Sequence, residues 1–336
     1  MSKVLVTGAA GFIGYHVSSD LLDAGHDVVG LDAMTDYYDV RLKQARLDRL
    51  IRKPGFTFVA GAVQEQGLLS GLFAEHGFDY VIHLAAQAGV RHSIESPRDY
   101  LESNIAGTFE LLEAARAHPP RHMLLASTSS VYGANRDLPY GETMRADHQM
   151  SFYAATKKAG EAMAHSYAHL YGLPTTMFRF FTVYGPWGRP DMALFKFTRA
   201  ILAGEMIDVY NQGRMRRDFT YVSDLSTAIL GLMTKVPGLP ETAPEIPDDS
   251  LSPIAPWRVI NLGNSQPVEL GRFIEAIETA TGRPARRNLL PMQPGDVPQT
   301  WADTTLLRTL IGSVPNTDID EGVASFVTWY RDYYGV

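Results

Sequence analysis

The stretch from Lys3 to Gly14, KVLVTGAAGFIG, constrains the fold of this chain more than any other. An apolar run stops at a glycine and an amphipathic pattern follows, which predicts a strand, a tight turn and a helix. Gly8 permits the turn, Gly11 lets the backbone approach a pyrophosphate closely, and Gly14 lets the helix pack near the strand. A phosphate would then meet the N-terminus of the helix. The stretch therefore predicts a dinucleotide-binding site.

A second apolar run, Val28 to Leu31, ends in Asp32, about twenty residues after the glycines. A carboxylate at this place can bind the hydroxyl groups of an adenosine ribose. It would also repel the 2′-phosphate of NADP, so the pattern favours NAD. Without the glycine turn, Asp32 would be read as an ordinary aspartate in a turn after a strand.

Composition narrows the class of protein. The chain has 336 residues, of which 45% are hydrophobic and 20% charged, which is typical of one large globular domain or two smaller ones. A net charge of -7 gives no attraction to nucleic acids or anionic membranes, and the lack of cysteine excludes disulfides, thiolate zinc sites and thiol catalysis. The first strand starts at about residue 3, which leaves no room for a signal peptide, and no apolar run approaches the ~18 residues of a membrane span. We therefore expect a soluble cytoplasmic protein that acts on a small molecule, with no nucleic-acid or membrane partner.

The order of predicted elements indicates the fold. Further apolar runs separated by helical patterns predict strands at 56–60, 79–84, 121–126 and 175–181. Such alternation is typical of an α/β fold with a doubly wound parallel, Rossmann-like sheet. The loops that begin at the carboxyl ends of parallel strands converge on one cleft, and here they start at Gly8, Asp32, Leu84 and Ser127.

Beyond residue 181 the alternation loosens, which predicts a smaller C-terminal substrate-binding lobe. We expect residues 1–181, joined by about 216–235 and 258–265, to form the NAD-binding domain, and 182–215, 236–257 and 266–336 to form the substrate domain. Residues 236–257 hold six prolines and four acids without periodicity, which predicts a surface excursion. The predicted helix at 40–52 carries a basic face that we expect to be solvated: Arg41, Lys43, Arg46, Arg49 and Arg52.

Tyr153 and Lys157 lie one helical turn apart at the start of a helical pattern, so they share a face. A free phenol titrates at about 10, and an adjacent ammonium should lower its pKa. Tyr153 could then take a proton from a hydroxyl group while hydride leaves the same carbon. Among 16 tyrosines such a pair can arise by chance, but the preceding strand delivers hydroxyl groups to the same cleft edge: Ser127, Thr128, Ser129 and Ser130.

Several motifs together resemble the extended short-chain dehydrogenase/reductase family over essentially the whole chain. They are GAAGFIG at 8–14, HLAAQAGVR at 83–91, Asn104 in NIAGT, STSSVYG at 127–133 and YAATK at 153–157. Within that family, three longer segments are similar to UDP-glucuronate 4-epimerases: TDYYD at 35–39, FFTVYGPWGRPDMALFKF at 180–197 and RRDFTYV at 216–222.

The resemblance implies NAD as the cofactor and a role for each matching residue. Tyr153 would be the catalytic base and acid, Lys157 would tune it and bind the nicotinamide ribose, and Thr128 would bind the reacting sugar oxygen. Asp32 would hold the adenosine ribose. The remaining cofactor contacts would come from the pyrophosphate turn and from the opposite side of the cleft: Gly8, Gly11, Phe12, Ile13, Gly14, Ala85, Ala86, Gln87 and Asn104.

On the substrate side, the resemblance implies that Tyr210 stacks on uracil, Arg217 meets the diphosphate and Asp296 holds the uridine ribose. The sugar carboxylate would face Thr182, Ser129, Ser130 and Arg189. Two positions depart from the family pattern. Ala62 stands where relatives usually have an adenine-contacting aspartate, and Gly160 stands where they commonly have asparagine.

The implied reaction is 4-epimerisation of UDP-glucuronate to UDP-galacturonate. Tyr153 would deprotonate the hydroxyl on sugar carbon 4, hydride would pass to NAD, and it would return to the other face after the ketone turns. Because the intermediate is a β-keto acid, decarboxylation to a UDP-pentose is an alternative. Decarboxylases of the family carry glutamate where Ser130 stands, and UDP-glucose/galactose 4-epimerases usually have asparagine where Thr182 stands, so acid-sugar epimerisation is favoured.

Two alternatives from other classes and one assembly prediction remain. A non-catalytic NAD-sensing protein could share the fold, although intact catalytic residues argue against it. His165 and His169 have metal-ligand spacing on a helix, but with no acid between them and no third ligand we predict no metal site.

Members of the family commonly form homodimers through helices that flank the sheet, and the segments at 97–117 and 151–171 could serve either this purpose or core packing.

Overall fold

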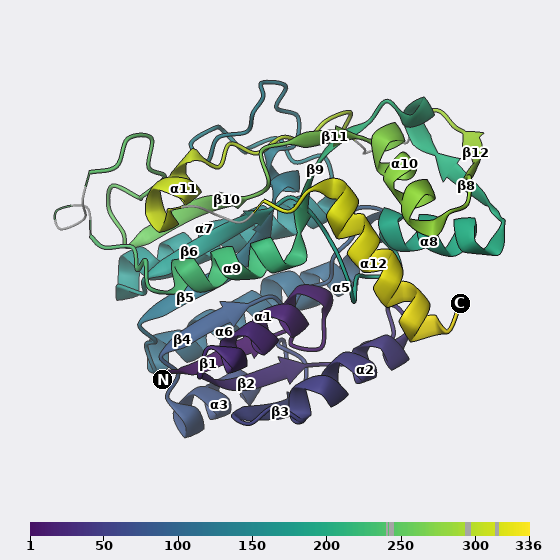
Figure 1. The fold of residues 1–336 in the computed structure, drawn as a ribbon. Helices are drawn as coiled ribbons and strands as arrows, with labels where there is room; N and C mark the ends of the chain where they lie inside the picture. The colour runs from purple at the N-terminus through teal and green to yellow at the C-terminus, as the bar shows by residue number, and fades with distance from the viewer. Residues whose placement is uncertain (240, 242–244, 293–296, 313–315) are drawn as a thin grey trace.

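The computed structural model describes residues 1–239, 241, 245–292, 297–312 and 316–336. Within these residues, a seven-stranded parallel sheet runs through the molecule in the order β10-β6-β5-β4-β1-β2-β3 (Figure 1). Its strands are β1 (Lys3–Thr7), β2 (Asp27–Asp32), β3 (Phe56–Ala60), β4 (Tyr80–His83), β5 (His122–Thr128), β6 (Thr175–Phe180) and β10 (Trp257–Leu262). The doubly wound, Rossmann-like sheet predicted from the sequence is confirmed.

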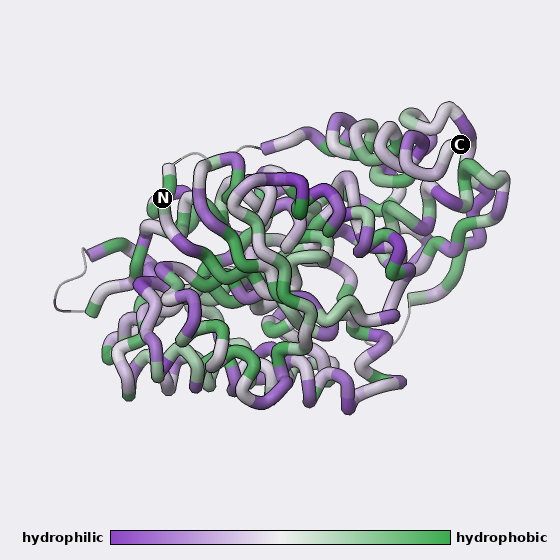
Figure 2. The backbone as a smooth tube through the Cα atoms, turned by 90° about the horizontal axis from the view of Figure 1, so that it is seen from below, coloured by the Kyte–Doolittle hydropathy of each residue, from purple (hydrophilic) through white to green (hydrophobic). Residues whose placement is uncertain are grey.

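Helices cover both faces of this sheet, which is why its central strands are continuous apolar runs. Hydrophobic side chains of α1 (Phe12–Asp23), α9 (Val222–Met233) and α11 (Thr305–Ile311) pack on one face. Those of α3 (Leu68–His76), α6 (Gly107–Ala117) and α7 (Phe152–Tyr171) pack on the other. Figure 2 shows the hydrophobic segments gathered in the middle of this body.

The chain approaches α6 through three short elements: α4 (His92–Glu95), α5 (Pro97–Tyr100) and a π-helical turn, η1 (Leu101–Ala106). The helix α7 begins where the Ser151 side chain accepts a hydrogen bond from the Ala154 N–H (3.1 Å), and ends at Gly172 with φ +65°. This capping fixes the helix that carries Tyr153 and Lys157.

Two strands extend farther than the sequence pattern predicts. Asp32 lies on β2, and β5 continues to Thr128, where it pairs with Phe180 of β6. Ser127 and Thr128 are therefore strand residues, held by the sheet and not by a flexible loop.

A smaller group of elements follows β6. It contains the sheet β11-β9-β7 and the strand pair β12-β8. The strands are β7 (Thr182–Tyr184), β8 (Met206–Val209), β9 (Arg216–Tyr221), β11 (Pro267–Glu269) and β12 (Arg286–Leu289), with the 3₁₀ turn η3 (Tyr210–Gly213) after β8. The helices α8 (Ala193–Ala203), α10 (Leu270–Thr281) and α12 (Ile319–Tyr334) enclose an aromatic core, in which Phe219 and Phe273 stack with ring centroids 4.2 Å apart.

In Figure 1, α12 crosses from this lobe towards α2 (Val40–Ile51) of the larger body. The end of segment 236–257 is anchored to the large sheet, although the sequence predicts a surface excursion. Asp249 accepts hydrogen bonds from Arg258 Nε (2.8 Å) and Nη2 (2.7 Å), and both side chains are buried. This ion pair ties the segment to β10.

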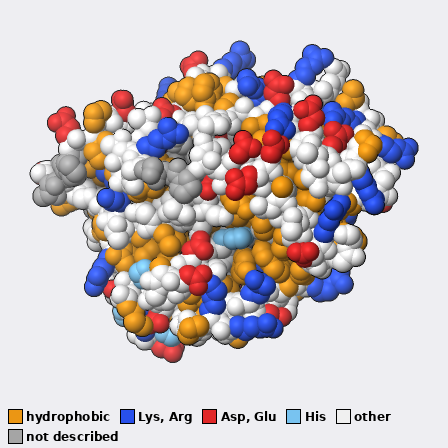
Figure 3. Space-filling view, viewed as in Figure 1, with side chains coloured by type: hydrophobic (Ala, Val, Ile, Leu, Met, Phe, Trp, Pro, Cys, Tyr) orange, Lys and Arg blue, Asp and Glu red, His pale blue; other side chains and the backbone are white. Residues whose placement is uncertain are grey.

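Acidic and basic side chains are intermixed on the face shown in Figure 3. Of the helices in the described residues, not one combines the length and the apolarity that crossing a bilayer demands.

Candidate active site

The glycine turn has the geometry that the sequence predicts. Gly8 adopts φ +72° and donates its N–H to the Leu31 carbonyl (2.7 Å). A Cβ on Gly14 would lie 2.0 Å from the Gly8 carbonyl oxygen, so only glycine fits there. Within the described residues, no side chain caps α1 at Gly11. The N–H groups of Phe12 and Ile13 in its first turn thus have the arrangement that an anion such as a pyrophosphate requires.

Asp32 is buried and bound to the same turn. Its Oδ2 accepts a hydrogen bond from the Ala10 N–H (3.0 Å), and its Oδ1 accepts one from the Met34 N–H (2.8 Å). Each carboxylate oxygen can accept a second bond, so the group can still bind a ribose hydroxyl. Asp32 therefore shapes the turn and keeps room for a further hydrogen bond.

The loop after β4 meets the glycine turn. Ala85 donates its N–H to Thr7 Oγ1 (3.1 Å), and a Cβ on Gly8 would come within 2.9 Å of the Ala85 nitrogen. Asn104, buried in the π-helical turn, holds the end of this loop at Gln87: its Oδ1 accepts from the Gln87 N–H (2.9 Å), and its Nδ2 donates to the Gln87 carbonyl (3.0 Å). Ala86 lies between these two anchored points.

Asn104 also reaches α7, the helix that carries Tyr153 and Lys157. Its Nδ2 lies 3.0 Å from Thr156 Oγ1, and that hydroxyl donates to the Tyr153 carbonyl (2.8 Å). The side chain of Asn104 thus fixes the cofactor-side loop relative to α7.

The predicted hydroxyl groups gather at the end of β5. Thr128 Oγ1 accepts a hydrogen bond from the Ser130 N–H (3.2 Å) and lies 3.3 Å from Ser130 Oγ. The Thr128 side chain lies close enough to Tyr153 to lower the pKa of its phenol, and the Tyr153 ring stands edge-on to Tyr100 at 6.0 Å. Ser129, next to them, opens the 3₁₀ turn η2 (Ser129–Tyr132). The Tyr153 phenol therefore lies beside the hydroxyl cluster.

The electrostatics of the pair differ from the sequence prediction. Burial raises the pKa of Tyr153, against the opposing effects of the Thr128 hydroxyl and the positive charge of Arg189. The Lys157 ammonium donates a hydrogen bond to the Ala126 carbonyl (2.9 Å), and burial lowers the pKa of Lys157 to about 8. The prediction that Lys157 lowers the pKa of the phenol was wrong for this structure, because burial dominates and the charge that acts on Tyr153 comes from Arg189.

Behind the hydroxyl cluster lies a buried ion pair that the sequence analysis missed. Glu161 accepts hydrogen bonds from Arg179 Nε (2.9 Å), Arg179 Nη2 (2.8 Å) and the Ser127 hydroxyl (2.7 Å). The pKa of Glu161 is lowered, because the bonds and charge of Arg179 outweigh burial. A glutamate in a helical pattern gives no sign of a partner on a strand eighteen residues later.

The basic face predicted at 40–52 is solvated at Arg41, Arg49 and Arg52, but the prediction was wrong for its other two residues. Arg46 is fully buried and Lys43 nearly so. Arg46 Nη1 donates to the Ala10 carbonyl (3.0 Å) in the glycine turn, and its Nη2 donates to the Trp187 carbonyl (2.6 Å). Arg46 therefore joins the cofactor turn to the loop that carries Arg189.

Arg189 pairs with Asp191 through Nε (3.0 Å) and Nη2 (2.6 Å). Both side chains are half-buried, and the guanidinium lies 5.8 Å from the centre of the Tyr37 ring. Tyr37, from the TDYYD segment after β2, thus reaches the residue predicted to face the sugar carboxylate.

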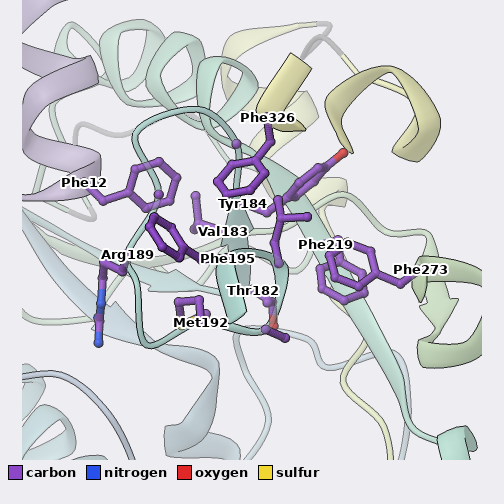
Figure 4. Close-up of a pocket in the computed structure, with 14 residues that line it drawn as sticks. Phe12, Thr182, Val183, Tyr184, Arg189, Met192, Phe195, Phe219, Phe273 and Phe326 are labelled. Atoms are coloured by element: carbon purple, nitrogen blue, oxygen red, sulfur yellow. The ribbon is translucent and has the colours of Figure 1, made fainter. Parts of the chain in front are cut away.

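Thr182 and Arg189 share the wall of a cavity of about 40 Å³ whose other lining residues are aromatic, aliphatic or glycine (Figure 4). In Figure 4, Phe12 lies on the same side of the cavity as Arg189, and Phe219 and Phe273 lie on the opposite side. This volume has room for about three water molecules, so a sugar nucleotide needs space beyond it.

The predicted uridine contacts lie on the smaller lobe. Tyr210 lies in η3 after β8, with the Arg91 guanidinium 5.0 Å from its ring centre. Arg217 on β9 donates to the carbonyls of Arg216 (3.0 Å) and Pro298 (3.3 Å). Asp296 lies outside the described residues.

The two departures from the family pattern lie just after β3 and on α7. Gly61 donates its N–H to the Asp32 carbonyl (3.1 Å), so Ala62, two residues after the end of β3, lies beside the end of β2. A Cβ on Gly160 would meet no atom within 4 Å.

The paired histidines of α7 bind protein groups. His165 Nε2 lies 2.8 Å from Ser252 Oγ, and His169 Nδ1 lies 3.0 Å from the Ile254 carbonyl. Nowhere in the described residues do three or more histidine, aspartate or glutamate side chains come together as metal ligands would.

These features define a Rossmann-type nucleotide site joined to a hydroxyl and tyrosine cluster. The chain belongs to the NAD dependent epimerase/dehydratase family, whose model matches residues 4–242.

Within this family, the chain is similar to relatives that carry a more specific name. The chain is 54% identical over 334 residues to the probable UDP-glucuronate 4-epimerase of Rhizobium meliloti (strain 1021), covering 99% of this chain and 98% of that protein. It is 45% identical over 344 residues to UDP-glucuronate 4-epimerase 1 of Arabidopsis thaliana, covering 99% of this chain and 77% of that protein. The crystal structure of UDP-glucuronic acid 4-epimerase from Bacillus cereus, in complex with UDP-glucuronic acid and NAD, matches with a TM-score of 0.87 and 31% identity over 99% of this chain and 100% of that chain.

Proposed function

We propose that this chain catalyses the NAD-dependent 4-epimerisation of UDP-glucuronate to UDP-galacturonate. The observation that carries the proposal is the meeting of α7 with the end of β5: Lys157, one turn after Tyr153, donates to the Ala126 carbonyl (2.9 Å), two residues before Thr128. Both the Thr128 hydroxyl and the charge of Arg189 lower the pKa of the Tyr153 phenol. Thr128 could bind a sugar hydroxyl, and Arg189 could bind a sugar carboxylate. The full-length similarity to proteins named for this activity supports it.

The chain's residues fit NAD. The first turn of α1, with Gly8, Gly11 and Gly14, would hold the pyrophosphate, and Asp32 would hold the adenosine ribose. The loop between Ala85 and Gln87 would line the other side of the cofactor. When bound, NAD supplies a hydride acceptor that returns the same hydride, so it is not consumed.

Tyr153 would take the proton from the hydroxyl on carbon 4 and later return it to the ketone oxygen. Thr128 would bind that oxygen and, together with the charge of Arg189, favour the phenolate against the effect of burial. Lys157, with a pKa of about 8, is mostly protonated at pH 7 and would donate to a ribose hydroxyl.

The sugar carboxylate would face Arg189, Thr182, Ser129 and Ser130. These groups are cationic or neutral, so they accept an anionic sugar without repulsion. We further propose that Tyr210 stacks on uracil, Arg217 meets the diphosphate and Asp296 holds the uridine ribose.

The same proposal divides the chain into an NAD-binding part and a substrate-binding part with the boundaries predicted from the sequence. Support comes from α9 and β10, which pack with α1 and β1 around the large sheet. The segment that holds β9 is the exception within this division, because β9 pairs with β7 and β11 of the smaller lobe. The lack of cysteine is compatible with the cytoplasmic location that we propose.

We also propose a homodimer through the helices at 97–117 and 151–171. Leu101 and Phe109 lie two helical turns apart, and they are 45% and 46% exposed. Sedimentation of the purified protein should give a dimer, and Phe109→Glu should shift it towards the monomer. A monomeric wild type would contradict the proposed assembly.

The activity is tested by a proton NMR time course of the purified protein with UDP-glucuronate and no added NAD. Appearance of UDP-galacturonate would support the proposal and show that the cofactor is carried by the protein. UDP-xylose or an accumulating 4-keto sugar would make the protein a decarboxylase instead. No reaction even after NAD is added would point to another substrate or to an NAD-sensing protein.

A further inference from the structure

Asp191, the carboxylate that pairs with Arg189, has no role in the proposed reaction. Asp191 occupies the edge of the guanidinium formed by Nε and Nη2, at 3.0 and 2.6 Å. Arg189 Nη1 has no hydrogen-bond partner among the described residues. The guanidinium can therefore hold Asp191 by one edge and offer the other to a second carboxylate.

Asp191 is ionised in this arrangement. Burial alone would raise its pKa, but the charge and hydrogen bonds of Arg189 outweigh burial and leave the pKa lowered. The Tyr37 hydroxyl also points at Asp191 Oδ2, at a longer 3.4 Å. The pair therefore carries almost no net charge at neutral pH.

The loop beneath the pair is fixed from the cofactor side. Arg46 binds the carbonyl of Trp187, and His16 Nε2 lies 2.9 Å from the carbonyl of Pro186. Trp187 itself adopts φ +62°, a left-handed conformation that a bulky residue keeps only where its surroundings enforce it. Arg189 thus starts from a rigid backbone, and Asp191 decides where its guanidinium points.

We infer that Asp191 is a positioning residue that limits how tightly Arg189 binds the substrate carboxylate. It orients the free edge of the Arg189 guanidinium towards that carboxylate and weakens the positive charge of the edge. This inference rests on the proposed function. Epimerisation at carbon 4 requires the ketone to turn between two hydride transfers, and the carboxylate must change its contacts as it turns. An arginine with its full charge would hold the carboxylate in one orientation and stabilise the ground state, which slows turnover.

The variant Asp191→Asn tests this. Asparagine keeps the shape and one oxygen that can accept an N–H of Arg189, but it removes the negative charge. We expect the KM for UDP-glucuronate to fall about five- to tenfold and kcat to fall by a similar factor. Binding of UDP-glucose, which lacks the carboxylate, should change less than about twofold.

The matched control is Asp147→Asn. Asp147 pairs with Arg145, again two residues apart, with Nε and Oδ2 2.9 Å apart on the exposed surface. It should leave both constants unchanged. If Asp191→Asn fails to fold, as judged by circular dichroism, Asp191→Ser takes its place with the same expected shifts.

A rise in the KM for UDP-glucuronate, or equal shifts for UDP-glucuronate and UDP-glucose, would make Asp191 a merely structural residue and overturn the inference. Unchanged constants would overturn it too. A wild type that does not convert UDP-glucuronate would instead remove the proposed function, and the inference with it, so the two failures are distinguishable.

Discussion

Replacing Arg179 by methionine should destabilise the fold strongly. The change removes two charged hydrogen bonds to Glu161, at 2.9 and 2.8 Å, each worth about 1.5–3 kcal/mol. Glu161 is 1% exposed, and among the described residues it would keep as partners Lys158 and the Ser127 hydroxyl. Breaking a buried ion pair from one side costs about 3–5 kcal/mol, so we expect the free energy of unfolding to fall by that amount.

Urea unfolding followed by circular dichroism measures this change. The control is Arg145→Met, which breaks an exposed pair and should cost less than about 1 kcal/mol. Adding Glu161→Leu to Arg179→Met removes the stranded charge and should recover much of the loss. A single variant within 1 kcal/mol of wild type, or a double variant less stable than the single one, would refute this account of the buried pair.

Other predictions concern the site and the pH dependence of stability. Tyr153→Phe should abolish turnover and leave bound NAD largely unchanged, and a wild-type rate would remove Tyr153 from the mechanism. Ser130→Glu should raise the KM for UDP-glucuronate by charge repulsion, and an unchanged KM would move the sugar carboxylate elsewhere. Gly14→Ala should lower the melting temperature and NAD content because its Cβ meets the Gly8 carbonyl, whereas Gly71→Ala, with open space in α3, should stabilise by up to about 1 kcal/mol; equal effects would contradict this reading. Burial lowers the pKa of three histidines to about 4 or below: His16, His83 and His122. Since only the unfolded chain takes up these protons, stability should be full above pH ~6.5 and should fall as pH drops towards 4, by up to about 1.4 kcal/mol per pH unit for each histidine. Urea melts at stepped pH that show no decline below pH ~6.5 would contradict this.

The sequence predicted what depends on local pattern. The strand, turn and helix at residues 3–14 follow from apolar spacing and from glycines whose backbone geometry is local. The parallel sheet follows from the alternation of elements, and the meeting of Thr128 with Tyr153 follows from strand ends that converge.

The sequence did not predict contacts and pKa values that depend on partners far apart in the chain. Arg46 resembles the solvated residues beside it on α2, yet it binds carbonyls 36 and 141 residues away, and a backbone carbonyl carries no sequence signal. The pKa of Tyr153 depends on how deeply the folded chain buries it, and spacing alone does not reveal this. Asp249 likewise finds Arg258 only after the preceding segment has folded onto the sheet.

The central claim is that hydride leaves carbon 4 of the sugar and returns to it within one site. The most direct measurement gives the purified protein UDP-glucuronate deuterated at carbon 4, in ordinary water and without added NAD, and follows the products by NMR. The account predicts UDP-galacturonate that keeps its deuterium at carbon 4. A product that carries hydrogen from water at that carbon would contradict the account, because the deuterium would then have been lost to solvent and not carried by NAD to the other face.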